Sequence, residues 1–123
     1  MKVKLFHVAC TRSGDKGDSS NIGVIFEHEE VYRWAVDNIT ADVVKRHLKG
    51  IASSDVIRYE LPNLLAFNFI IKGSLRGGGS DSLLHDAQGK THGQLLLLLE
   101  LDVPDYFEKY LYSFNDKHII RHD

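Results

Sequence analysis

The chain has 123 residues, of which 43% are hydrophobic and 26% charged, a mix typical of one soluble globular domain around a single core. Its formal net charge of −2 at pH 7 argues against a nucleic-acid partner, which would require a basic surface. The first residues, Met1 to His7, include no long apolar run, so we expect no signal peptide. The longest apolar run, Leu95 to Leu99, is far too short to span a membrane, and we therefore expect a cytoplasmic protein.

Two strands are predicted near the N-terminus, at residues 3–10 and 22–27, on either side of a polar segment from Arg12 to Asn21. The second strand shows a period of two, which is typical of a strand with one buried face. In it Ile22, Val24 and Phe26 alternate with Gly23, Ile25 and Glu27.

Two helices are predicted next. The first covers residues 29–36, and Thr40 is a suitable N-cap for the second. Apolar residues of the second helix recur at spacings of three and four, and Gly50 is a natural terminator. The expected buried residues are Val31, Tyr32, Ala35 and Ile39 from the first helix, and Ala41, Val44, Leu48 and Ile51 from the second.

The second half of the chain adds a hairpin and a leucine-rich segment. Strands are predicted at residues 55–61 and 65–71, joined by a turn at Pro62 and Asn63. Five consecutive leucines without β-branching predict a helix over residues 89–100, and Pro104 can begin another helix that ends near Phe114. These elements predict an α+β sandwich with helices on one face of a largely antiparallel sheet.

The other face of that sheet has mixed polarity, because Ala66, Asn68 and Ile70 lie beside Lys72. A partly apolar outer face is often covered by a second subunit. We therefore expect a homo-oligomer.

The polar segment from Arg12 to Asn21 is the strongest candidate site, because a simple connection between strands needs only about two to five residues. Gly14 and Gly17 permit backbone N–H groups to converge on an anion, with Ser13 beside them. Arg12 and Lys16 would supply the positive charge that holds a carboxylate or phosphate. The segment therefore predicts a loop that binds an acidic small molecule.

Two aspartates complicate this interpretation, because a carboxylate repels a bound anion. Asp15 and Asp18 would pair with the neighbouring cations, cap backbone groups, or hold a divalent cation that bridges to the anion. The alternative is a rigid structural loop whose charges are satisfied internally.

A second candidate is the run of Gly77, Gly78 and Gly79 after Arg76. Consecutive glycines cost conformational entropy, and the usual reason for them is a close approach of the backbone to a ligand or to another backbone. A surface hairpin is the alternative. If this run and the polar segment meet at one rim of the sheet, their convergence favours a ligand.

The remaining candidates are weaker. His85, next to Asp86, is a candidate acid–base residue, and Cys10 is either a nucleophile or a buried thiol at a strand end. The sequence around Gly89 and Lys90 lacks the first glycine of a phosphate-binding P-loop, and the spacing of His118 and His122 alone does not indicate zinc. We predict no resident metal or cofactor.

Six motifs together resemble the AtuA-like ferredoxin-fold domain of the acyclic terpene utilisation protein A family, over about residues 5–101. They are Arg12-Ser-Gly-Asp-Lys-Gly-Asp18, Asn21-Ile-Gly-Val24, Arg58-Tyr-Glu-Leu-Pro62, Ala66-Phe-Asn-Phe69, Leu75-Arg-Gly-Gly-Gly79 and Gln88-Gly-Lys90. The resemblance implies a ferredoxin-like two-layer sandwich with a four-stranded sheet. The single cysteine excludes an iron–sulfur cluster held by this chain alone, despite the name of the fold.

In the family this domain follows a much larger N-terminal domain, and the whole protein is associated with breakdown of acyclic terpenes through acyl-CoA intermediates. The resemblance therefore implies either a small subunit whose partner is a separately encoded AtuA-type large subunit, or a free-standing descendant of the domain. We expect residues 1–101 to form the domain and residues 102–123 to be a helical extension and tail. The motif positions carried over are Arg12, Ser13, Asp15, Lys16, Asp18, Asn21 and Gly77 to Gly79.

Three functions fit these residues. The first is an accessory or binding subunit that holds a carboxylate or an acyl-CoA at the two candidate loops. The second is a small lyase, isomerase or hydrolase in which Asp15, Asp18 or His85 transfers protons. The third is a structural subunit whose loop charges contact only protein.

Overall fold

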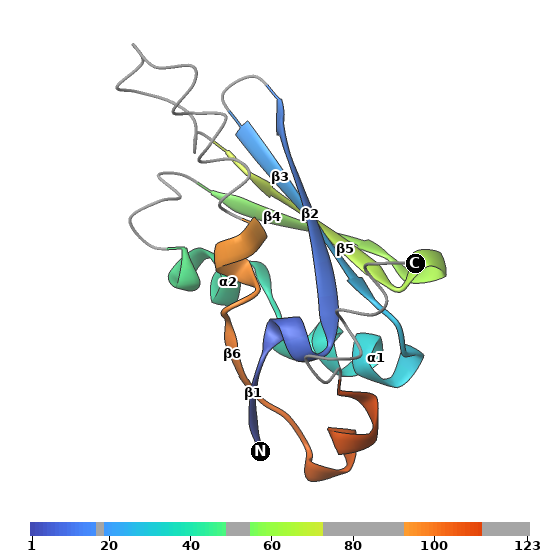
Figure 1. The fold of residues 1–123 in the computed structure, drawn as a ribbon. Coiled ribbons are helices and arrows are strands. Elements are labelled where there is room, and N and C mark those ends of the chain that lie inside the picture. The colour runs from blue at the N-terminus through green and yellow to red at the C-terminus, as the bar shows by residue number, and fades with distance from the viewer. Residues whose placement is uncertain (17–18, 49–54, 73–92, 112–123) are drawn as a thin grey trace, which may run out of the picture.

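The computed structural model describes residues 1–16, 19–48, 55–72 and 93–111. Within these residues the largest element is an antiparallel sheet of four strands in the order β2-β3-β5-β4 (Figure 1). β3 (Ser19–Phe26) and β5 (Ala66–Ile71) are central, and β2 (Ala9–Lys16) and β4 (Val56–Leu61) lie at the edges. This is the ferredoxin-like α+β arrangement that the sequence predicts.

The polar segment is mostly strand, which corrects the loop predicted for Arg12 to Asn21. β2 and β3 pair without interruption from Ala9 opposite Phe26 to Lys16 opposite Ser19. The ladder continues because its backbone hydrogen bonds do not require apolar side chains. Gly17 and Asp18, between the paired ends, lie outside the described residues.

Both predicted helices are confirmed, and both lie on the same face of the sheet (Figure 1). α1 spans Glu29–Asn38 and α2 spans Ala41–His47. Thr40 caps α2 as predicted, because its hydroxyl oxygen accepts a hydrogen bond of 3.3 Å from the Val43 N–H. The predicted end of this helix at Gly50 lies outside the described residues.

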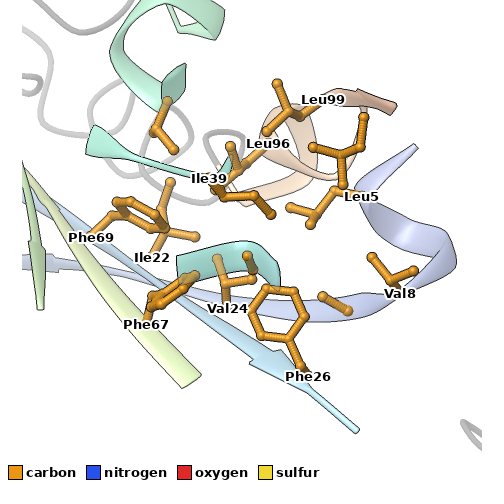
Figure 2. Packing of buried hydrophobic residues seen from close by; sticks show 14 of the residues in the cluster. Leu5, Val8, Ile22, Val24, Phe26, Ile39, Phe67, Phe69, Leu96 and Leu99 are labelled. Atoms are coloured by element: carbon orange, nitrogen blue, oxygen red, sulfur yellow. The ribbon is translucent and has the colours of Figure 1, made fainter. Parts of the chain in front are cut away.

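The core fills the space between the sheet and the helices. Ile22, Val24 and Phe26 of β3 are buried, as the alternating pattern predicts, and Phe67 and Phe69 of β5 lie beside them. Figure 2 shows these side chains pointing towards Ile39, Leu96 and Leu99 on the opposite layer. The described members of the core form one continuous cluster that reaches from Val3 to Phe107.

The hairpin of β4 and β5 is confirmed, and its turn is a short 3-10 helix, η2 (Pro62–Leu64), followed by Leu65 with a φ of 50°. Arg58 of β4 points towards the helices rather than to solvent. Its guanidinium donates to the carbonyls of Val36 (2.8 Å) and Ile39 (2.9 Å) and lies 4.7 Å from the centre of the Phe67 ring. These bonds satisfy carbonyls at the C-terminal end of α1.

The single strand predicted for residues 3–10 is wrong, because η1 (Leu5–His7), a 3-10 turn, separates β1 (Lys2–Lys4) from β2. β1 pairs instead with β6 (Glu100–Asp102) in a small second sheet. This pairing continues where the Leu5 N–H donates to the Leu99 carbonyl at 2.8 Å. The chain therefore turns from one sheet into the other at η1.

The helix predicted for residues 89–100 is only partly correct. Residues 93–96 are helical, but the chain then straightens into β6, because the carbonyls of Leu97 and Leu99 accept hydrogen bonds from the η1 segment. A run of identical leucines has no periodicity from which the end of a helix can be predicted. The helix predicted after Pro104 is a 3-10 helix, η3 (Asp105–Tyr110), whose Phe107 is buried against Trp34.

Candidate functional site

The sheet face opposite α1 and α2, here called the outer face, is the surface on which the sequence-predicted site residues can be traced. Burial alternates along β3, so that Ile22, Val24 and Phe26 are buried while the residues between them are half-buried. Because residues that are paired across neighbouring strands point to the same face, the alternation of β3 also tells which residues of β2, β5 and β4 point outward. The outward residues include Cys10, Arg12, Gly14, Ser19, Asn21, Gly23, Ile25, Ile57, Tyr59, Leu61, Ala66, Asn68 and Ile70.

The outer face has an unusual charge pattern for an acidic chain. Among its outward residues whose side chains the structure describes, there is no carboxylate, whereas the whole chain has 17 acidic residues and a net charge of −2. Arg12 is exposed on this face and has no ion pair within the described residues. Arg33 and Arg58, by contrast, each pair with a glutamate. Among the described residues, Arg12 is thus an exposed arginine without a carboxylate partner.

A hollow of about 450 Å³ lies over the central strands β3 and β5. Its lining consists of Ser19, Ser20, Asn21, Asn68 and Ile70, so hydroxyl and amide groups contribute to it together with apolar surface. The Asn21 side-chain N–H donates to the Asn68 carboxamide oxygen at 3.3 Å, so the two amides hold each other in place across β3 and β5. Hydrogen-bonding groups therefore converge in this hollow from two strands.

Gly14 makes room for Asn21. The two residues face each other in the β2–β3 ladder, and a Cβ atom on Gly14 would come within 3.0 Å of the Asn21 side-chain oxygen. A side chain at position 14 would push the Asn21 amide away from its partner Asn68. The absence of a side chain at Gly14 therefore allows Asn21 to keep its hydrogen bond with Asn68 at the hollow.

A model of the AtuA ferredoxin-like domain family matches residues 3–102, which is most of the chain. The chain belongs to the AtuA ferredoxin-like domain family. No curated protein and no solved structure matches it.

The domain divides the predicted ligand-binding residues between its two faces. Arg12 and Asn21 are on the outer face, but Ser13 points to the opposite side, where it contacts Gly93. There a Cβ on Gly93 would come within 1.9 Å of the Ser13 hydroxyl oxygen, and the Thr11 hydroxyl donates to the Gly93 carbonyl at 3.2 Å. In the described residues, Ser13 is therefore a packing contact for the segment that precedes β6.

Several sequence-predicted residues cannot be placed. The backbones of Asp15 and Lys16 pair with Ser20 and Ser19 in the β2–β3 ladder. Asp18, His85 and the glycines Gly77 to Gly79 lie outside the described residues, as does the proposed meeting of the two loops. The acid–base roles of Asp15, Asp18 and His85 therefore stay predictions. Cys10 is half-buried on the outer face, opposite Ile25.

Asn68 is the site residue that the sequence analysis missed. It lies next to Gly23 in the sheet and contributes to the hollow through its bond with Asn21. A signal was present, since Asn68 is a polar residue between Ala66 and Ile70 in an otherwise apolar strand. Only the register of β3 against β5 reveals that it meets Asn21.

A second hollow, of about 430 Å³, lies at the start of α1 and is lined by His28, Glu29, Glu30, Arg33 and Tyr110. The Tyr110 hydroxyl donates to the Glu30 carboxylate at 2.7 Å, and this bond raises the pKa of Tyr110. The Tyr110 ring also packs against that of His28, at 4.6 Å between centroids. These contacts attach η3 to the start of α1. The residues that line this hollow are therefore explained by the packing of η3 on α1.

Two further features were sought in the described part of the chain. It holds no group of three or more His, Cys, Asp or Glu side chains placed to bind a metal ion. It also holds no helix with the length and apolar character needed to cross a membrane.

Proposed function

We propose that the chain is an accessory domain that holds an acidic small molecule on the outer face of its sheet. The observation that supports this most directly is the hollow to which Ser19, Asn21 and Asn68 contribute from a face that presents Arg12 and no described carboxylate. Its volume of about 450 Å³ falls within the range of small-molecule sites.

The chemistry of the lining favours an anion. The Ser19 hydroxyl and the carboxamide N–H groups can donate hydrogen bonds, and the guanidinium of Arg12, which has no ion pair within the described residues, adds a charge-assisted donor in a planar fork. A charge-assisted hydrogen bond contributes about 1.5–3 kcal/mol, so Arg12 supplies much of the binding free energy of a small carboxylate. An acyl-CoA is too large for the hollow as a whole, and only part of it would enter.

A calorimetric titration tests this proposal. We expect wild-type protein to bind at least one probe among benzoate, hexanoate and acetyl-CoA, and Arg12→Gln to weaken that binding about tenfold or more. Arg46→Gln is the matched control, because Arg46 is an exposed arginine of α2, on the other layer of the molecule. Binding that is lost equally in both variants, or absent from wild type with and without Mg²⁺, would contradict the proposal.

Assembly onto a larger AtuA-type subunit is the second candidate function. It is favoured by three large apolar side chains at the β4–β5 hairpin, since Tyr59, Leu61 and Leu64 are 52%, 40% and 66% exposed. Co-purification with a co-expressed large subunit tests it, and Leu64→Ser should weaken that association while leaving the fold intact. A homo-oligomer covering the same side chains would instead appear as a higher mass in light scattering of the chain alone.

A further inference from the structure

Gly23 lies at the centre of the outer face. It is in the middle of β3, with Arg12 opposite it on one side and Asn68 opposite it on the other. Neighbouring strands are about 4.8 Å apart, so the Cα atoms of Arg12 and Asn68 are about 10 Å apart across Gly23. Gly23, which has no side chain, therefore separates the strand position of Arg12 from that of Asn68 on the outer face.

The fold itself does not require glycine at this position. Gly23 does not adopt the left-handed backbone conformation that favours glycine, and a Cβ atom there would meet nothing closer than the Arg12 carbonyl oxygen at 3.8 Å, an ordinary van der Waals distance. The same addition would approach Asn21 to 3.0 Å from Gly14 and Ser13 to 1.9 Å from Gly93. Those two glycines have packing reasons, whereas Gly23 has none among its described neighbours.

A glycine inside a central strand weakens the strand, because it loses more conformational entropy on folding than alanine and packs no side chain. Such a glycine usually marks a place where a ligand or another backbone approaches closely. A ligand that approaches Gly23 would find a hydrogen-bond donor on each side. Arg12 has no ion pair within the described residues, and the carboxamide of Asn68 is oriented by its hydrogen bond with Asn21.

We infer that Gly23 is a specificity-determining residue of the outer face, and that the ligand is a small carboxylate whose carboxylate group rests on the Gly23 backbone between Arg12 and Asn68. This inference rests on the proposed function and adds the position of the acidic group. The rest of the ligand then lies over Asn21 and Ile70, the next outward pair along the same two strands and part of the lining of the hollow.

Gly23→Ala and Gly23→Val test the inference, with benzoate as the calorimetric probe. We expect Gly23→Ala to melt at the same or a higher temperature than wild type, because the strand gains a residue that fits without a clash. We expect its affinity for benzoate to fall at least tenfold, and that of Gly23→Val to fall further. Ile25→Val, on the same strand and face, is the control and should change the affinity less than threefold.

The outcomes separate the two claims. Wild-type protein that binds none of benzoate, hexanoate and acetyl-CoA overturns the proposed function and this inference with it. Binding of acetyl-CoA without binding of benzoate or hexanoate overturns the inference alone. Wild-type protein that binds benzoate, together with Gly23→Ala of equal affinity, overturns the inference alone. A large fall in the melting temperature of Gly23→Ala also overturns it, because the fold would then need the glycine. If a Gly23 variant changes its oligomeric mass but keeps its affinity for benzoate, then Gly23 serves contacts between copies of the chain. That result also contradicts the inference.

Discussion

The side chain of Arg58 contacts both the helix layer and the sheet layer of the molecule. Its guanidinium is only 15% exposed, and it reaches two carbonyls at the end of α1, the Glu60 carboxylate and the Phe67 ring. The sequence alternation placed Arg58 on the face opposite Ile57 and Tyr59, without indicating that this face packs on the helices. A charged residue on an inward position is compatible with the core because its donors are satisfied.

Replacing Arg58 with methionine should destabilise the protein by about 2–4 kcal/mol, because the carbonyls of Val36 and Ile39 lose their donors while buried. Unfolding in urea measures the difference. Glu60→Gln is the control, since Glu60 is half-exposed and its ion pair should contribute less than about 1 kcal/mol. Equal effects of the two substitutions would show that the carbonyl contacts carry little free energy.

The buried hydroxyl of Tyr32 has no hydrogen-bond partner within the described residues, so its removal has a predictable effect on stability. Tyr32→Phe removes an unsatisfied polar group while keeping the ring contacts with Phe26 and Phe67. We expect the free energy of unfolding at pH 7 to stay equal or rise by about 1 kcal/mol. A loss of 2 kcal/mol or more in chemical denaturation would mean that the hydroxyl is bonded.

At the scale of elements, the contact between β2 and the helical residues 93–96 joins the two halves of the chain. Gly93 packs against Ser13, and its carbonyl accepts from Thr11. The same segment is held on its other side by His47 of α2, whose ring nitrogen lies 2.7 Å from the Leu95 carbonyl oxygen. Sheet and helix layers thus both contact this segment.

Gly93→Ala should therefore cost about 2–3 kcal/mol of stability, because the new methyl group overlaps the Ser13 hydroxyl. The double variant Ser13→Ala/Gly93→Ala should recover most of this loss, since the nearest remaining atoms would be 3.3 Å or more from the added Cβ. A double-mutant cycle by chemical denaturation measures the coupling. Strict additivity of the two substitutions would contradict the described contact.

The elements also show what the sequence can predict and where it fails. Val24 and Phe26 alternate with non-core residues, and Thr40 precedes an amphipathic helix, so strand, helix and cap were predicted from local patterns that tertiary packing confirms. The strand character of residues 12–16 was missed, because backbone pairing rather than side-chain pattern holds the end of a hairpin. Arg12 and Asn21 were identified from composition, but the hydrogen bond of Asn21 to Asn68 depends on the register between distant strands, which no local pattern encodes.

At the scale of the whole molecule, three tyrosines lead us to expect that the stability of the fold falls at alkaline pH. Burial raises the pKa of Tyr32 and of Tyr106, and the bond to Glu30 raises that of Tyr110, all above the usual value of 10.0. A group whose folded pKa is raised stabilises the fold fully below its unfolded pKa, and this contribution is lost as the pH rises through the folded value.

We therefore expect the melting temperature to stay nearly level up to about pH 9 and to fall progressively above pH 10. Tyr110→Phe should reduce the slope of that fall, whereas Tyr59→Phe, at an exposed position of β4, should leave it unchanged. Melting curves recorded from pH 7 to pH 11 provide the measurement. Parallel curves for all three proteins would mean that other groups control the alkaline transition.

We propose that the outer face of the sheet, rather than the hollow at the start of α1, receives an acidic small molecule. Nuclear magnetic resonance during a benzoate titration tests it most directly, because the side-chain amides of Asn21 and Asn68 and the backbone amide of Gly23 each give their own signal. The account predicts saturable shifts of these three signals, with α1 signals unmoved. Benzoate shifts confined to α1 and η3, or no saturable shift on β3 and β5, would contradict it.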